Sequence, residues 1–254
     1  MIIDSHAHPF GNPNVDLRGK IRSQRDAVLL RVREPDTFRQ LWSNPHDLTE
    51  EMLNDMDANG IEKALIQTGP GENLDFLAAA LRKHPTRFFG MCSAPRGITK
   101  RYSISAPVMD EDVTRAMLDD FDRILDYQIK TLGFRGVGEG VNYVFTQAAE
   151  TSDIVRDLLP VMEVLDQHRV PIMFSTAWTQ FGTPIDKAIP YFVDELAAAF
   201  PQVPIILTKM GRGYDFLFEI CLFIAFKHTN VYLDSVQAPA RHIARAVKEI
   251  GADR

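Results

Sequence analysis

The sequence predicts an α/β fold of the (β/α)8 TIM-barrel type. Short apolar runs alternate with amphipathic helical patterns from one end of the 254-residue chain to the other. Strict alternation of this kind is typical of parallel strands with helices packed outside them. The chain length suits one barrel domain. Hydrophobic residues make up 45% of the chain, which is enough for a sizeable core. We therefore expect a single domain over residues 1–254.

The first part of the chain combines one strand, a long polar segment and a helix. Met1-Ile2-Ile3 opens as a strand, and residues 11–44 follow as an insert or lid, rich in Arg and Asp. A segment of that length without clear periodicity is often functional. Asp47 is expected to be the N-cap of the first helix, which should end at Asn59-Gly60.

The remaining elements follow from apolar periodicity and from Gly and Pro stop signals. Pro160 predicts a kink or a late start in its helix, and Pro239 is expected in the first turn of the last helix. A parallel barrel needs eight β/α units, and the eighth strand would start where the sequence stops, so the last unit is expected to be missing. Strands are expected at 63–67, 87–93, 131–137, 170–175, 203–208 and 231–234, and helices at 73–84, 110–127, 153–168, 186–200, 214–227 and 238–250.

Composition narrows the classes of partner. The formal net charge is −6, and the basic residues are scattered, so nucleic acid and anionic membranes are poor candidates. The only two cysteines, Cys92 and Cys221, lie in apolar stretches and are expected to be reduced core residues. No signal peptide is expected, because residues 1–10 lack a basic region and a long apolar run, and residues 216–226 are too short to span a bilayer. A cytoplasmic protein with a small-molecule substrate is expected, and a homo-oligomer stays open.

Two histidines stand close to the N-terminus in the run Ile3-Asp4-Ser5-His6-Ala7-His8. Residues at i and i+2 of a strand point to the same face. On the first strand of a barrel that face can be the interior, where two imidazoles could hold a divalent metal ion. Two hydrogen-bonded barrel histidines are the alternative.

This run resembles the opening metal motif of the amidohydrolase superfamily, in the amidohydrolase-related branch that includes aminocarboxymuconate-semialdehyde decarboxylase. The resemblance implies a TIM barrel, a zinc or manganese ion, and hydrolysis or non-oxidative decarboxylation of a small carboxylate- or carbonyl-bearing substrate. It implies His6 and His8 as metal ligands. The resemblance extends over nearly the whole chain, and its other segments are 56–64, 133–137, 231–235 and 250–254.

The chain departs from the family pattern at the other expected ligands. Ser175 stands where the resemblance implies a metal-binding histidine at the end of strand five, and Lys209 where it implies a second one after strand six. The family's aspartate after strand eight would lie beyond residue 254. Occupancy of the metal site is therefore open. Glu139, just past strand four, is a candidate third ligand or a solvated loop acid.

Lys209 has three interpretations. Its ammonium could replace the positive charge of the metal and hold an anionic substrate. A desolvated Lys209 could instead form a Schiff base with a carbonyl substrate. It could also be an inert lysine that reaches water at the barrel rim or pairs with Asp234. Together with Ser175 and Asp234, which could orient a histidine, it forms the candidate catalytic group.

Other candidate residues lie at predicted strand ends and loops of the same rim. Guanidinium groups suit bidentate binding of carboxylates, so Arg96, Arg135 and Arg212 are candidate substrate-binding residues, with surface ion pairs as the alternative. Trp178 could line an apolar pocket there or pack within its loop.

Three functions stay open. The first is an amidohydrolase-type hydrolase or lyase. The second is a metal-free enzyme that uses Lys209, which borohydride trapping would test. The third is a non-catalytic, degenerate barrel that binds a small molecule or partner, which metal analysis would help to discriminate.

Overall fold

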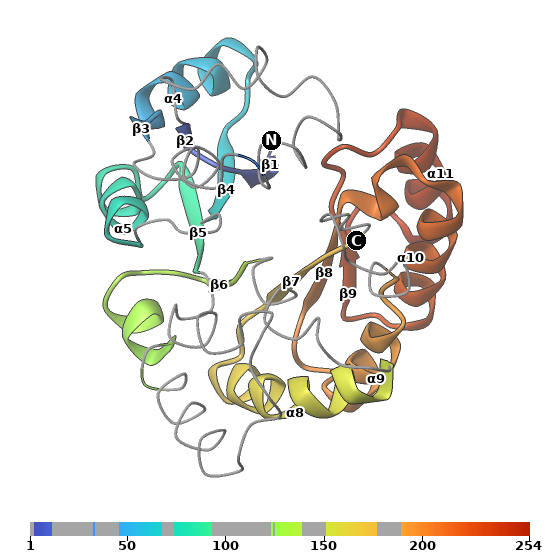
Figure 1. The fold of residues 1–254 in the computed structure, drawn as a ribbon. Coiled ribbons are helices and arrows are strands. Elements are labelled where there is room, and N and C mark those ends of the chain that lie inside the picture. Colours follow the sequence, from blue (N-terminus) through green and yellow to red (C-terminus); the bar gives the residue numbers. More distant parts are fainter. Residues whose placement is uncertain are drawn as a thin grey trace.

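The computed structural model describes residues 3–11, 33, 46–67, 74–92, 123, 125–138, 151–176 and 189–254. In these ranges seven parallel strands form one sheet in the order β1-β4-β5-β6-β7-β8-β9. Helices lie outside the curled sheet (Figure 1). The predicted barrel architecture is confirmed, and seven strands fit a barrel without its final β/α unit.

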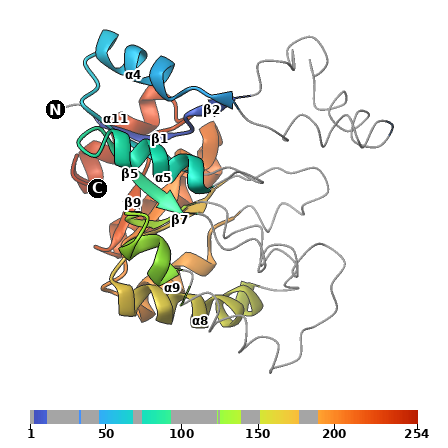
Figure 2. The same ribbon diagram turned by 90° about the vertical axis from the view of Figure 1, so that its left-hand side faces the viewer.

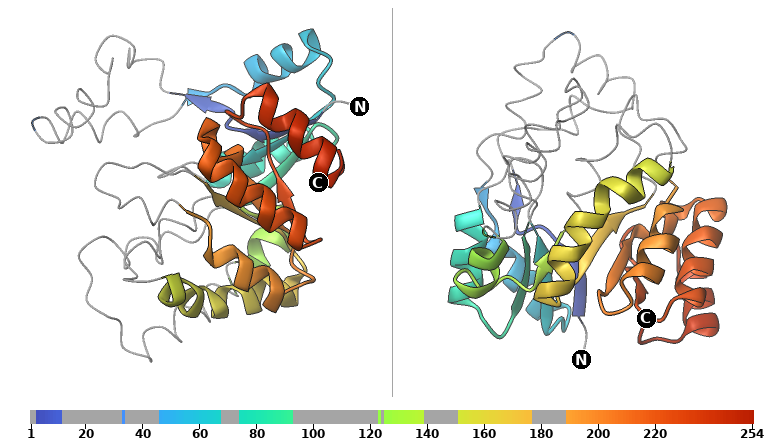
Figure 3. Two further views of the ribbon diagram at one scale, coloured as in Figure 1. Left: turned by 90° about the vertical axis from the view of Figure 1, so that its right-hand side faces the viewer. Right: turned by 90° about the horizontal axis from the view of Figure 1, so that it is seen from below.

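The strands and helices alternate along the chain as expected. The side views show helices running alongside the strands, with α10 and α11 next to each other (Figures 2 and 3). The strands are β1 (Ile3–Ala7), β4 (Lys63–Gln67), β5 (Phe88–Cys92), β6 (Gly136–Val137), β7 (Ile172–Ser175), β8 (Ile205–Thr208) and β9 (Val231–Leu233). The helices are α4 (Thr49–Ala58), α5 (Leu74–Lys83), α8 (Thr151–His168), α9 (Phe192–Ala199), α10 (Asp215–Lys227) and α11 (Ala240–Ile250).

The insert expected at residues 11–44 falls almost entirely outside the described residues. Its two ends are brought together by a short antiparallel pair, β2 (Phe10–Gly11) and β3 (His46–Asp47). The chain therefore leaves the barrel after β1 and returns beside the same point before α4.

Several predicted boundaries were wrong for local reasons. Leu48, not Asp47, is the N-cap of α4, although Asp47 Oδ1 accepts the Thr49 N–H at 2.8 Å. The strand expected at 131–137 shrinks to β6, because Thr131 and Leu132 form a turn and Gly133 adopts φ +81°.

The two proline predictions for later helices also needed correction. Pro160 does not delay the start of its helix, since α8 runs from Thr151 to His168, and the kink that Pro160 also predicts stays a prediction. Pro239 is the N-cap of α11 and not a first-turn residue. Its φ of −64° with ψ of 147° places it just outside the helix, where its missing N–H leaves no hydrogen bond unmade.

The core lies between the sheet and the inner faces of the helices. In α8, Leu158, Met162 and Leu165 are almost fully buried, and their spacing of three and four residues puts them on one face. Burial of such side chains stabilises the fold by about 1.5–3 kcal/mol each. All four residues of β7 are buried, as expected for a parallel strand covered on both faces. Among the described residues, none of the helices has both the length and the apolar character needed to cross a bilayer.

The edge of the sheet beyond β9 contacts residue 254. The Leu233 N–H donates to the Arg254 carbonyl oxygen at 2.8 Å, where a further parallel strand would begin to pair. The Arg254 guanidinium donates to the carbonyl oxygens of Ala225 at 3.0 Å and His228 at 3.4 Å, at the end of α10.

Candidate active site at the carboxyl ends of the strands

His6 and Asp234 connect the two edges of the sheet. The ring of His6, on β1, is buried, and its Nδ1 lies 2.8 Å from Oδ2 of Asp234, directly after β9. This contact requires the sheet to curl until its first and last strands approach. An ionised carboxylate can only accept hydrogen bonds, so the Nδ1–H of His6 donates, and Nε2 is the acceptor nitrogen when the ring is neutral.

The same carboxylate also holds the main chain of Lys209. Asp234 Oδ1 accepts the N–H of Lys209 at 2.9 Å and the N–H of Val236 at 3.0 Å. Asp234 is only 2% exposed, so these are buried, charge-assisted hydrogen bonds. One side chain thus fixes the orientation of the His6 ring and the start of the Lys209 segment.

The side chain of Lys209 is buried among hydroxyl groups. Lys209 is 7% exposed, and its Nζ donates to Ser175 Oγ at 3.2 Å and to Thr208 Oγ1 at 3.4 Å. Ser175 ends β7 and Thr208 ends β8. The carboxyl ends of adjacent parallel strands therefore place an ammonium group and two hydroxyls together, at the barrel face where TIM-barrel active sites lie.

The backbone that carries Lys209 is left-handed. Positive φ angles occur at Lys209 (69°), Met210 (41°) and Arg212 (54°), as well as at Gly211 (73°). This conformation costs a non-glycine residue about 1–2 kcal/mol. Such strain tends to cluster at functional sites, where the surrounding structure holds it in place.

Thr176 is one of the groups that hold this turn. Its hydroxyl donates to the carbonyl oxygen of Thr208 and accepts the N–H of Gly211 at 2.9 Å. The turn also packs tightly, because a Cβ on Gly211 would lie 2.5 Å from the backbone nitrogen of Phe218. Thr176 and Gly211 therefore help to position the main chain of Lys209.

His8 lies beside His6, as their spacing predicts. The two ring centroids are 5.2 Å apart, with an angle of 67° between the ring planes. His8 Nδ1 lies 3.1 Å from the carbonyl oxygen of Gln67, the last residue of β4. A carbonyl only accepts, so Nε2 is again the acceptor nitrogen when the ring is neutral.

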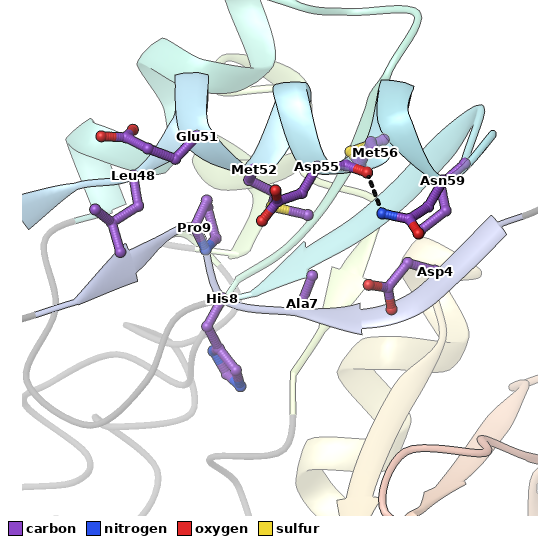
Figure 4. Close-up of a pocket in the computed structure, with 11 residues that line it drawn as sticks. Asp4, Ala7, His8, Pro9, Leu48, Glu51, Met52, Asp55, Met56 and Asn59 are labelled. Atoms are coloured by element: carbon purple, nitrogen blue, oxygen red, sulfur yellow. Dashed lines mark hydrogen bonds between the residues drawn. The ribbon is translucent and has the colours of Figure 1, made fainter. Parts of the chain in front are cut away.

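A shallow pocket lies between β1 and α4, lined by acidic side chains that include Asp4, Glu51 and Asp55. Figure 4 shows the imidazole of His8 pointing away from the other residues of this pocket. Neither Lys209 nor Asp234 lines the pocket. His8 is thus the one pocket-lining residue that also belongs to the candidate active site.

The structure brings together five of the residues that the sequence singles out: His6, His8, Ser175, Lys209 and Asp234. Arg212 is exposed and follows Lys209 in the left-handed turn. Arg135 is also exposed, but it precedes β6 and so lies before the strand, not after it. Glu139, Arg96 and Trp178 lie outside the described residues.

Sequence reasoning missed three polar residues that support the site: Gln67, Thr176 and Thr208. Each is fully buried and lies at or next to the carboxyl end of a strand. A polar side chain that closes an apolar run was the available signal, because in a parallel barrel that position faces the carboxyl end of the sheet.

The cysteines take no part in this chemistry. Burial raises the pKa of the Cys92 thiol and of the Cys221 thiol to about 12. Neither is a thiolate near neutral pH, so neither is a nucleophile or a metal ligand there.

Comparison with known proteins gives one family and a set of similar folds. The amidohydrolase family profile matches residues 3–254. None of the curated protein sequences matches this chain. Similar solved structures include 4-oxalomesaconate hydratase from Rhodopseudomonas palustris (15% identity, 98% of this chain and 78% of that chain, TM-score 0.58). Another is a 5-carboxyvanillate decarboxylase variant from Novosphingobium aromaticivorans with bound manganese (16% identity, 100% of this chain and 85% of that chain, TM-score 0.56). An organophosphorus hydrolase variant from Deinococcus radiodurans is also similar (16% identity, 100% of this chain and 73% of that chain, TM-score 0.52). At these identities the likeness establishes the fold.

A resident divalent ion, of the kind seen in the decarboxylase, does not fit the residues described here. A catalytic zinc site usually has three protein ligands. Within the described ranges, no group of three or more His, Cys, Asp or Glu could hold an ion. His6 and His8 supply two nitrogens, while the Asp234 carboxylate already accepts three hydrogen bonds and Lys209 brings a positive charge.

Proposed function

Because this chain belongs to the amidohydrolase family, we propose that it is an enzyme that acts on a small carboxylate- or carbonyl-bearing substrate. The reaction is hydrolysis or non-oxidative decarboxylation, carried out at the carboxyl ends of the strands. One observation carries the proposal: the carboxylate of Asp234 holds both the buried imidazole of His6 and the main-chain N–H of Lys209, whose side chain is also buried.

Lys209 has the role of binding negative charge. Its ammonium is buried, so an anionic oxygen that replaced water there would gain more from it than at the surface. Ser175 Oγ, 3.2 Å from Nζ, can donate a second hydrogen bond to the same substrate group. A carboxylate, or a carbonyl oxygen that gains negative charge during the reaction, fits this pair. Arg212 is the proposed outer contact for a second anionic group.

His6 has the role of moving a proton. Asp234 holds the imidazole with its proton on Nδ1, which leaves Nε2 to accept a proton or return one. In hydrolysis, Nε2 would take the proton of the attacking water. In decarboxylation, a protonated Nε2 would protonate the carbon that keeps the electron pair when carbon dioxide leaves.

The similar solved structures support a carboxylate substrate. The names 4-oxalomesaconate hydratase and 5-carboxyvanillate decarboxylase both describe enzymes acting on carboxylates. The sequence alone proposes the remaining roles. These are substrate binding for Ser175, shaping of the substrate site for Arg96, Arg135 and Trp178, and a third ligand to an ion for Glu139.

We extend the proposal to partners and location. A net charge of −6 and two buried thiols suit a cytoplasmic protein that binds a small molecule and neither nucleic acid nor membrane. A homo-oligomer is compatible with this.

The test is turnover on a panel of hydroxybenzoates, β-keto acids, lactones and amides, with carbon dioxide release and hydrolysis measured separately. Lys209→Met should raise KM at least about tenfold, which corresponds to about 1.4 kcal/mol of lost substrate binding. His6→Gln should lower kcat by about 10²–10⁴-fold, the usual contribution of a general acid or base. Lys248→Met, an exposed change on α11, is the matched control and should leave both constants unchanged.

Two outcomes would redirect the proposal. Binding of panel members without turnover of any would favour the non-catalytic barrel. A borohydride-stable adduct on Lys209, formed only with a carbonyl substrate, would make the lysine a nucleophile and not an anion-binding group.

A further inference from the structure

The candidate active site holds buried charges of both signs. Among its described side chains, Lys209 supplies one positive charge and Asp234 supplies one negative charge, both buried. His6 and His8 each place Nδ1 against an oxygen atom, that of Asp234 and that of the Gln67 carbonyl. Among the described residues of the site, the charges of Lys209 and Asp234 therefore balance one another.

The ammonium of Lys209 is held in place and is not an incidental surface group. Its main chain is tied to Asp234, its Nζ contacts Ser175 and Thr208, and its φ of 69° keeps the residue in a strained conformation. A lysine whose ammonium only extends into solvent needs neither burial nor a strained backbone, whereas Lys209 is 7% exposed and has both.

A divalent cation beside His6 and His8 would meet two unfavourable conditions. It would find two neutral ligands where about three are usual. It would also bring two positive charges to a site where the buried Lys209 already supplies an ammonium, and like charges repel.

We infer that the Lys209 ammonium takes the place of the family's metal ion, so that this chain uses a fixed lysine charge where its relatives use a cation. The two imidazoles remain as a proton-transfer group and its neighbour. This inference rests on the proposed use of this barrel face as the substrate site. Its test measures metal binding and not turnover, so the two proposals can fail separately.

The test is a gain of metal binding in Lys209→His. This change removes the positive charge and adds a third imidazole to a site that already presents two. Full-length wild type, Lys209→His and Lys209→Met are titrated with Mn²⁺ and Zn²⁺ by calorimetry, and bound metal is counted after gel filtration. Wild type should hold much less than one equivalent. Lys209→His should hold about one, with affinity at least about tenfold above wild type.

The controls separate charge from ligand number. Lys209→Met removes the charge without adding a ligand and should bind metal more weakly than Lys209→His. Lys248→His adds an exposed imidazole on α11 and should change nothing. Adding His8→Asn to Lys209→His should abolish the gain. Circular dichroism checks that each variant is folded.

Two results would overturn the inference. The first is one tightly bound Mn²⁺ or Zn²⁺ per chain in wild type, lost in His6→Asn. The second is a folded Lys209→His that gains no metal affinity, since the lysine would then not be what excludes the ion. If Lys209→His does not fold, tight metal binding by wild type would still overturn the inference, and Lys209→Met still measures the effect of removing the charge.

Discussion

Asp234→Asn tests how the candidate active site is held together. The change keeps the shape of the side chain and removes its charge. The amide oxygen can still accept the N–H groups of Lys209 and Val236, which lie 2.9 and 3.0 Å from Oδ1. Hydrogen bonds to charged groups contribute about 1.5–3 kcal/mol and neutral ones about 0.5–1.5 kcal/mol, so these two bonds lose about 2 kcal/mol together. The expected loss in the free energy of unfolding is therefore about 2 kcal/mol.

The same variant should move the proton on His6. With the amide oxygen kept on the two N–H groups, the amide nitrogen faces His6 Nδ1, which must then accept, so that the ring proton moves to Nε2. Urea denaturation measures the stability, and ¹⁵N chemical shifts of the ring nitrogens report the tautomer. Asp55→Asn, an exposed change on α4, is the control and should stay within about 0.5 kcal/mol of wild type. A loss below about 0.5 kcal/mol in Asp234→Asn, or a proton that stays on Nδ1, would refute this reasoning.

Three further outcomes follow from the structure. Gly211→Ala should cost more than about 2 kcal/mol in urea denaturation, because its Cβ would meet backbone atoms at φ +73°; a cost near zero would mean that the turn relaxes. Hydrogen bonds from Lys227 and then His228 lower the pKa of Asp194 below 3.8. Its contribution to stability should therefore be present above about pH 4 and vanish as the pH falls through the lowered pKa, so Asp194→Asn and wild type should converge only in acid. The two buried thiols should resist iodoacetamide in the native protein at pH 8 and react after unfolding.

Much of the fold could be predicted because local signals and the barrel agree. The Asn59-Gly60 stop is confirmed, since Asn59 is the C-cap of α4 and Gly60 adopts φ +67°. Boundaries failed where a neighbouring contact outweighed the local signal. Asp47 pairs with Phe10 in β3, which moves the N-cap of α4 to Leu48.

The candidate site was predictable in its residues but not in its connections. The spacing of His6 and His8 predicted adjacent rings, and strand ends predicted Ser175, Lys209 and Asp234. The sequence left open whether Asp234 would orient a histidine or pair with Lys209. The structure shows it bonded to His6 and to the main-chain N–H of Lys209. The hydrogen bond to Lys209 depends on the left-handed turn. A lysine at position 209 does not predict such a turn.

The most direct test of the account is a crystal structure of the wild-type protein soaked with a small aromatic carboxylate and Mn²⁺, with anomalous data collected at the manganese edge. The account predicts the carboxylate on Lys209 Nζ and Ser175 Oγ, the His6–Asp234 contact intact, and no anomalous peak beside the two histidines. A manganese peak bound by His6 and His8, with the Lys209 side chain turned away, would contradict it.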